Sequence, residues 1–390
     1  MASRMPPRPS LPWPALLAVV ALPAMAAVAA LPSEPVAGLG PVEGLVALQV
    51  LALLVTSAVH ELGHWLAATA VGFRVAGWRV GPLAGMRTPL GWRLRLSPLS
   101  LAGGLLVPEP VGPEALRRRY TVVVLGGPAA HLALAGVLWA TAAVTGRLPV
   151  SLTAATVLAT GLANLVPVTL RPGDRWSDGR WLWAWAFRPA LAAQRVAVGS
   201  LQLALAAGVR PRDWDRGWVR LAVGGPRRPA DRAQVAGCLL GYRRALDQGD
   251  VDEAAGLLTR AFAGRGVLPQ RVRAALAIEA AFFAARYRGD SGLASRLLES
   301  EGRRPWAVLE PDLQRARAAL HLAEGREVEA VHACDRALVA LDGRAAGLAA
   351  LDRELVLAMR EEAGRGLAGG EAGPAAPAAP AGWAGGAATA

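Results

Sequence analysis

Long apolar runs, separated by short segments that carry arginine, dominate the first half of the chain. They cover residues 11–31, 42–71, 120–144 and 148–170. Each run reaches or exceeds the roughly 20 residues that an α-helix needs to cross a membrane. The mean hydropathy of the whole chain is +0.32, which is high for a soluble protein. The pattern therefore predicts an all-α polytopic membrane protein.

The first run, within residues 1–41, is either a retained membrane span or a signal segment. Arg4 and Arg8 precede it, and the Ala-Met-Ala sequence at 24–26 resembles a cleavage site. The length of the apolar run favours a retained span. In both cases the loop that follows lies outside the cell, so the second run enters the membrane from outside and ends inside.

Residues 73–113 follow the second run and alternate arginine with apolar residues, as in Trp-Arg-Leu-Arg-Leu at 92–96. A period of two indicates β-strands, and glycine and proline punctuate the segment. The arginines at 117–119 place it on the cytoplasmic side by the positive-inside rule. We expect a short cytoplasmic β-rich loop, which is either a solvated basic loop or a surface that holds an unwound substrate by strand addition along 92–96.

Residues 180–209 are apolar again, but Pro189 and Gln194 interrupt the run. The tryptophans between 176 and 185 are typical of an aromatic belt at a membrane interface. We expect a broken interfacial or re-entrant helix, with a fifth span as the alternative. Residues 42–209 would then form the membrane core, and the arginine-rich residues 210–234 would form a cytoplasmic linker.

Three segments in the last third of the chain each predict two amphipathic helices joined by a tight turn. They are residues 238–263, 273–300 and 312–341. The turn glycines Gly249, Gly289 and Gly325 lie 40 and then 36 residues apart. This spacing resembles a degenerate tetratricopeptide array over 235–345, and an ordinary helical bundle is the alternative. We expect a soluble helical-repeat domain that can bind a cytoplasmic protein, and then a final helix and a disordered Ala/Gly/Pro-rich tail at 346–390.

The net charge of +12 comes from arginine, because the chain contains no lysine. A basic chain can bind nucleic acid, but these arginines flank apolar runs, as they do in cytoplasmic loops. We therefore expect no nucleic-acid partner. Cys238 and Cys334 lie in the soluble part without the spacing of a metal site, so we interpret them as buried thiols in a reducing compartment.

One motif inside the second run carries chemistry, namely His-Glu-Leu-Gly-His at residues 60–64. His60 and His64 share one face of a helix and can bind one zinc ion, while Glu61 can accept a proton from water at the metal. The flanking residues 45–59 and 65–73 carry no charge. Ionisable side chains at membrane depth are functional by default. The motif predicts a zinc site inside the membrane, and two histidines satisfied by hydrogen bonds are the alternative.

A catalytic zinc site usually has three protein ligands, so a third ligand must come from another part of the chain. The motif at 60–64 is followed by Asn-Leu-Val-Pro at 164–167 and by Asp-Gly at 178–179. Over about residues 40–190, this combination resembles the site-2 protease family of intramembrane zinc metalloproteases. The resemblance implies three zinc ligands, which are His60, His64 and Asp178.

The same resemblance implies roles for three further residues. Glu61 would act as general base. The substrate-binding residues would be Asn164, which would hold the substrate backbone or the oxyanion, and Pro167, which would shape the end of its helix.

The segment before Asp178 is longer than in many relatives, which leaves Asp174 as a rival third ligand. Pro172 and Gly173 place Asp174 in a turn. Asp178 can instead begin a helix that holds its carboxylate in a fixed direction, and the Gly179 that follows lets the backbone turn tightly. We therefore expect Asp178 rather than Asp174 to bind the metal.

The third run contains Gly-Gly-Pro at 126–128 and then His131. Small residues of this kind let helices approach closely in lipid, so we interpret the glycines as a helix contact. Where relatives often carry asparagine after this Gly-Pro pair, the chain has His131. This histidine is a further ligand, a proton carrier or a hydrogen-bonded packing residue.

We expect an intramembrane zinc metalloendopeptidase that cleaves a membrane-anchored regulator near the cytoplasmic side, in regulated intramembrane proteolysis. Its partners would be a membrane-protein substrate and the lipid bilayer. The protein would reside in the cell membrane with its C-terminal domain in the cytoplasm. The alternatives are a catalytically inactive membrane scaffold that recruits a partner through its helical repeats, and a signal-anchored soluble zinc protease. The second alternative conflicts with the position of the motif inside an apolar run.

Overall fold

The computed structural model describes residues 41–88, 91–96, 104–170, 175–225, 231–301, 309–342 and 346–369. They belong to two compact units, unit 1 (Met1–Ala193) and unit 2 (Gln194–Ala390), and each unit is considered by itself. The first apolar run, Asp174 and the C-terminal tail lie outside the described residues. The interpretations of these three features therefore stay predictions, as does the division of the chain into domains.

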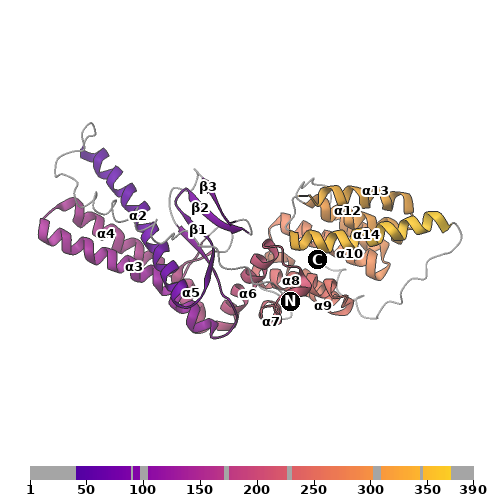
Figure 1. Ribbon diagram of the computed structural model, residues 1–390, viewed down its shortest axis with the longest axis horizontal. Coiled ribbons are helices and arrows are strands. Elements are labelled where there is room, and N and C mark those ends of the chain that lie inside the picture. Colours follow the sequence, from indigo (N-terminus) through magenta and orange to yellow (C-terminus); the bar gives the residue numbers. More distant parts are fainter. Residues whose placement is uncertain are drawn as a thin grey trace. The chain divides into compact units, whose positions relative to one another are not determined.

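Three helices form the first part of unit 1, namely α2 (Pro41–Ala70), α3 (Leu116–Thr145) and α4 (Leu148–Asn164) (Figure 1). Within the described residues, Ala47–Ala70 and Leu116–Thr145 are long and apolar enough to cross a membrane, whereas α4 is a shorter apolar helix. The run expected to extend to residue 170 is helical only to Asn164. The residue before a proline is biased away from the helical conformation, so the chain leaves the helix ahead of Pro167.

The helices α2 and α3 approach each other closely because glycines face each other at their crossing. A Cβ atom on Gly63 would lie 2.6 Å from the Cβ of Ala130, and a Cβ on Gly126 would lie 2.6 Å from that of Ala67. This confirms the helix contact predicted for the glycines of the third run. The crossing turns the motif-bearing face of α2 toward α3.

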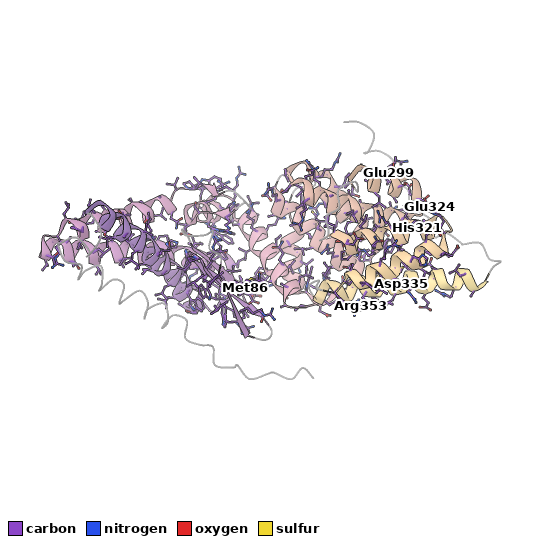
Figure 2. All side chains as sticks on the ribbon, turned by 90° about the horizontal axis from the view of Figure 1, so that it is seen from above. Met86, Glu299, His321, Glu324, Asp335 and Arg353 are labelled. Carbon is purple, nitrogen blue, oxygen red and sulfur yellow. The ribbon has the colours of Figure 1, made fainter. Side chains whose placement is uncertain are left out.

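The segment predicted to form strands is an antiparallel sheet of β1 (Arg74–Val80), β2 (Leu83–Thr88), β3 (Gly91–Leu96) and β4 (Gly104–Glu109). The strand order is β3-β2-β1-β4, so β3 and β4 are the edges. Figure 2 labels Met86 on the exposed surface of β2. Both β1 and β4 pack against α2, which places one edge of the sheet beside the motif.

After α4, a short hairpin of β5 (Thr169–Leu170) and β6 (Arg175–Trp176) leads into α5 (Asp178–Phe187) and α6 (Pro189–Ala206). The two helices are separated at Arg188, which confirms the break predicted at Pro189. The aromatic rings of this region pack together, with Tyr120 of α3 5.0 Å from Trp181 between ring centroids. Its position at a membrane interface stays a prediction.

Unit 2 is helical throughout its described residues. It contains α7 (Arg216–Val223), α8 (Arg232–Asp247), α9 (Val251–Ala263), α10 (Gln270–Arg288), α11 (Ser291–Glu301), α12 (Glu310–Ala323), α13 (Glu327–Ala340) and α14 (Ala346–Gly369), with 3₁₀ turns η1 (Pro211–Asp213) and η2 (Arg265–Val267). The pairs α8–α9, α10–α11 and α12–α13 confirm the three predicted hairpins. Gly249, Gly289 and Gly325 occupy their turns with φ of 77°, 63° and 68°, a conformation that favours glycine. The tetratricopeptide assignment itself stays a prediction.

Candidate metal centre

Three side chains from two helices of unit 1 converge on one point. His60 Nε2 lies 3.0 Å from His64 Nε2, which is one helical turn further along α2. Asp178, the first residue of α5, places Oδ2 3.0 Å from His60 Nε2 and Oδ1 3.3 Å from His64 Nε2. The structure thus brings together the three residues implied as zinc ligands.

The spacing of these atoms fits a metal ion. Zinc binds nitrogen and oxygen at about 2.0–2.2 Å, so tetrahedral ligand atoms lie roughly 3.3 Å from one another. The observed separations of 3.0 to 3.3 Å are close to this value. All three atoms accept hydrogen bonds in their ligating forms, so each pair needs a cation or a proton between its members. Asp178 Oδ2 is buried and has no hydrogen-bond partner within the described residues. The group can therefore bind a divalent metal.

The backbone around Asp178 holds its carboxylate in place. Ser177 caps α5 by accepting a hydrogen bond from the Arg180 N–H at 3.1 Å, and its hydroxyl donates to the Val166 carbonyl at 2.6 Å. A Cβ on Gly179 would overlap the carbonyl of Leu165. The start of α5 is therefore fastened to the chain that leaves α4. Asp178 begins the helix as predicted, but the cap is Ser177, which sequence reasoning missed although serine before a helix is a common signal.

The face of α3 that lies against the two histidines contains a glycine, which leaves room for their rings. A Cβ on Gly127 would lie 2.5 Å from His64 Nε2 and 2.7 Å from His60 Nε2. Any larger residue would occupy the space of the ligating atoms. Gly127 thus serves the centre as well as the helix contact that the sequence predicted.

The other ring nitrogen of each histidine also has a partner on α3. His64 Nδ1 lies 2.8 Å from the Val123 carbonyl oxygen, and His60 Nδ1 lies 2.7 Å from His131 Nδ1. Partners of this kind fix the orientation of a ligating imidazole. His131 therefore takes part in the centre through His60.

Glu61 lies beside the centre and faces the sheet. Its side chain is buried, and a Cβ on Gly104, the first residue of β4, would overlap its carboxylate. Glu61 Oε2 has no hydrogen-bond partner within the described residues. A buried carboxylate with an unpartnered oxygen is suited to accept a proton.

The two residues implied in substrate binding lie at the end of α4. Asn164 Nδ2 is 3.1 Å from His60 Nε2, so this amide belongs to the centre. Because it contacts the nitrogen that would bind a metal, the amide must turn aside when an ion is held there. Pro167 is exposed in the segment between α4 and β5, and its side chain has no polar group.

Residues 48–196 match the model of peptidase family M50, the family of the site-2 proteases. The matched segment contains every residue of the centre, from His60 to Asp178. This match indicates intramembrane metalloprotease activity in general and specifies no substrate. No curated protein and no solved structure matches the chain.

Proposed function

We propose that the chain is an intramembrane zinc metalloendopeptidase that hydrolyses peptide bonds of membrane-anchored substrates, such as a regulator, near the cytoplasmic side. One observation carries this proposal. His60, His64 and Asp178 converge in the geometry of a zinc site, on and beside a helix apolar and long enough to cross a membrane. The match of residues 48–196 to peptidase family M50 supports the same activity.

The residues of the centre divide the chemistry among them. His60, His64 and Asp178 would hold a zinc ion, which would supply Lewis-acid chemistry for the scissile carbonyl and for water. Glu61 accepts the proton that water loses and returns it to the leaving amine. Asn164 turns its amide from His60 toward the substrate carbonyl, where an N–H donor stabilises the developing negative charge.

The substrate must be unwound before it is cut, because a helix in lipid encloses its carbonyl groups in its own hydrogen bonds. An edge strand beside the centre can hold the unwound segment extended by main-chain hydrogen bonds. The sequence pointed to residues 92–96, which form β3, the edge remote from β4 in the strand order. Since Gly104 of β4 contacts Glu61, β4 is the edge better placed for this role.

The orientation of the protein is part of the proposal. The arginines at 117–119 and throughout 210–232 favour a cytoplasmic position for the sheet and for unit 2. The helical hairpins of unit 2 would then recruit a cytoplasmic protein, and the protein would reside in the cell membrane. A reporter fused after residue 235 should read as cytoplasmic, and an external signal would instead make 181–208 a fifth span.

The decisive experiment combines zinc analysis with cleavage of a transmembrane substrate by the purified protein. The wild type should bind one zinc ion per chain and cut the substrate. Glu61→Gln should keep the zinc and lose cleavage by a factor of about 10²–10⁴, the usual contribution of a general base. His64→Ala should lose the zinc. If Glu61→Gln cut the substrate as fast as the wild type, the cleavage would be due to a contaminating protease. That result would favour the inactive-scaffold alternative.

A further inference from the structure

The side chain of His131 on α3 is buried at 5 % exposure and contacts a residue of the metal centre. Its Nδ1 lies 2.7 Å from His60 Nδ1, and the ring centroids are 4.8 Å apart. We propose that His131 is a positioning residue, which holds His60 in the tautomer and orientation that zinc binding requires. This inference rests on the proposed function, because it assigns His60 as a zinc ligand.

When His60 binds a metal, the hydrogens on the His60 and His131 rings can take only one arrangement. His60 faces Asp178 and His64 with Nε2, so the Nε2 lone pair is the one offered to an ion. A neutral imidazole that binds through Nε2 carries its hydrogen on Nδ1. His60 Nδ1–H therefore donates to His131 Nδ1. His131 must accept there and carry its own hydrogen on Nε2.

The surroundings of His131 keep it aimed at His60. A Cβ on Gly161 of α4 would lie 3.1 Å from the His131 Cβ, so α4 packs directly against the base of this side chain. His131 Nε2 is buried and has no hydrogen-bond partner within the described residues. Of the two ring nitrogens of His131, only Nδ1, which faces His60, has a hydrogen-bond partner within the described residues. If His131 served packing alone, we would not expect its one hydrogen-bonded nitrogen to face a residue of the metal centre.

The other ligating histidine has a partner of a different kind. His64 Nδ1–H donates to the Val123 carbonyl at 2.8 Å. The Gly127 N–H also approaches this nitrogen, at 3.3 Å, but a nitrogen that carries hydrogen cannot accept a second one. His64 is thus oriented by the backbone, which no substitution removes. His60 depends on a side chain, so the role of His131 can be tested by mutation.

The size of the effect follows from other zinc proteins. Loss of an outer partner of a ligating histidine typically lowers metal affinity 10- to 100-fold. His131→Phe keeps a ring of similar size but removes the acceptor. His131→Asn is smaller and restores an acceptor. If the hydrogen bond matters rather than the volume, asparagine should recover what phenylalanine loses.

The experiment measures zinc affinity of the full-length protein in detergent by competition with a chelator, together with the absorption spectrum of the Co²⁺ form. His131→Phe should bind zinc about 10- to 100-fold more weakly and shift the Co²⁺ bands. His131→Asn should recover most of the affinity and the wild-type bands. The control is His332→Phe on α13, an exposed histidine of unit 2, which should change neither quantity.

A second measurement needs no variant and covers the case in which His131→Phe does not fold. In ¹⁵N-histidine NMR spectra of the zinc-loaded wild type, His131 should show the pattern of the Nε2–H tautomer. An Nδ1–H pattern for His131 would overturn the proposal. So would wild-type affinity and Co²⁺ bands in His131→Phe, or an asparagine variant as weak as the phenylalanine variant. A wild type that binds no zinc would remove the proposed function together with this inference.

Discussion

Each unit of the molecule buries a cluster of polar side chains, and the two clusters differ in how their atoms face one another. In unit 1, His60, His64 and Asp178 turn acceptor atoms toward a common point. In unit 2, the Arg315 guanidinium donates to Glu279 of α10 and to Asp352 of α14. The first cluster requires something between its members, whereas in the second a donor already faces acceptors. Burial of polar groups alone therefore does not identify a functional site, but acceptors that face acceptors do.

The Arg315 cluster is stabilised by its own charges. Burial alone would lower the pKa of Arg315, but the carboxylates of Asp352 and Glu279 outweigh this effect, so its pKa lies above the ordinary value. The guanidinium carbon also lies 4.3 Å from the ring centre of Phe282. Three helices of unit 2 are thereby joined by hydrogen bonds from one guanidinium to two carboxylates. Nothing in this arrangement calls for a ligand.

The strongest test of the comparison removes one member of the metal centre. Asp178→Ala should abolish cleavage and lower zinc affinity by more than about 100-fold, since even an outer partner of a ligand contributes 10- to 100-fold. Chelator competition and a cleavage assay measure the two effects. Asp174→Ala is the control and should keep most of the activity. The opposite result for the two aspartates would transfer the ligand to Asp174.

The corresponding substitution in unit 2 should lower the stability of that unit and leave the zinc affinity unchanged. Arg315→Leu removes the guanidinium that pairs with the buried carboxylates of Glu279 and Asp352, and leaves Glu279 with Arg243 at 3.8 Å. This loss should cost about 3–5 kcal/mol of local stability. Hydrogen exchange of peptides from α10 and α12 measures this loss. Adding Glu279→Leu and Asp352→Leu should restore part of the protection, because apolar side chains can replace buried ions, while Asp312, 3.6 Å from Arg315, keeps its charge. Zinc affinity should be that of the wild type in both variants, and a change would couple the two units.

A smaller effect should follow from adding one methyl group to the metal centre. Gly127→Ala would place a Cβ 2.5 Å from His64 Nε2, and the shift needed to accommodate it should weaken zinc binding by about 1–3 kcal/mol. Gly136→Ala on the same helix is the matched control, because an added Cβ there would meet nothing within 4 Å. Equal zinc affinities in the two variants would show that the ligands do not depend on this space.

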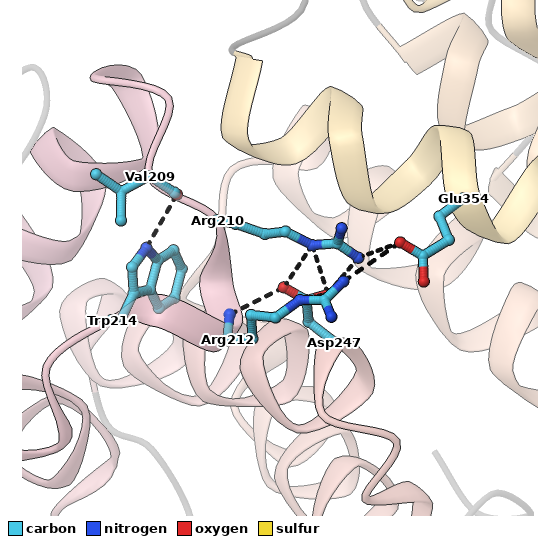
Figure 3. Close-up of polar contacts among 6 residues, drawn as sticks. All are labelled: Val209, Arg210, Arg212, Trp214, Asp247 and Glu354. Carbon is cyan, nitrogen blue, oxygen red and sulfur yellow. Dashed lines mark hydrogen bonds and ion pairs between the residues drawn. The ribbon is translucent and has the colours of Figure 1, made fainter. Parts of the chain in front are cut away.

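The smallest effect is expected at the surface of unit 2, where a second ion cluster joins η1, α8 and α14 (Figure 3). Arg210 contacts Asp247, whose side chain is fully buried, at 2.8 Å, and Glu354, whose side chain is 62 % exposed, at 2.5 Å. Glu354→Ala should cost less than about 1 kcal/mol, because solvent screens an exposed ion pair. Asp247→Ala should cost more, since it also strips the acceptor from the Arg212 backbone N–H. Thermal unfolding of the two variants, compared with the wild type, provides the ranking.

The parts of this molecule that the sequence predicts are the local ones. The spacing of His60 and His64 dictates a shared helix face, and the alternation at 92–96 dictates a strand, whatever the rest of the chain does. The hairpin glycines likewise mark their turns. The predicted convergence of Asp178 with the two histidines depended on resemblance to a family, because no local rule joins residues so far apart.

What the sequence does not reveal are contacts between distant segments. His131, Val123 and Gly127 reach the centre only because α2 and α3 cross at their glycines. The partners of Arg315 lie on other helices, and in the sequence each resembles an ordinary charge on an amphipathic helix. In both cases the missing information is tertiary packing rather than propensity. Ser177 differs, because a serine directly before a helix is a local signal that was overlooked.

The separation of the ligands along the chain has a consequence for biosynthesis. His60 and His64 leave the ribosome together, whereas Asp178 follows more than a hundred residues later. At about 5–20 residues per second, the third ligand is made on the order of 5–20 s after the first two. During that interval the nascent chain offers a two-histidine site of low affinity, and the full site exists only once Ser177 and Gly179 have docked against the end of α4. On the proposed function, stable acquisition of zinc would therefore follow the synthesis of α2, α3 and α4, and the centre would stay inactive until these helices are in place.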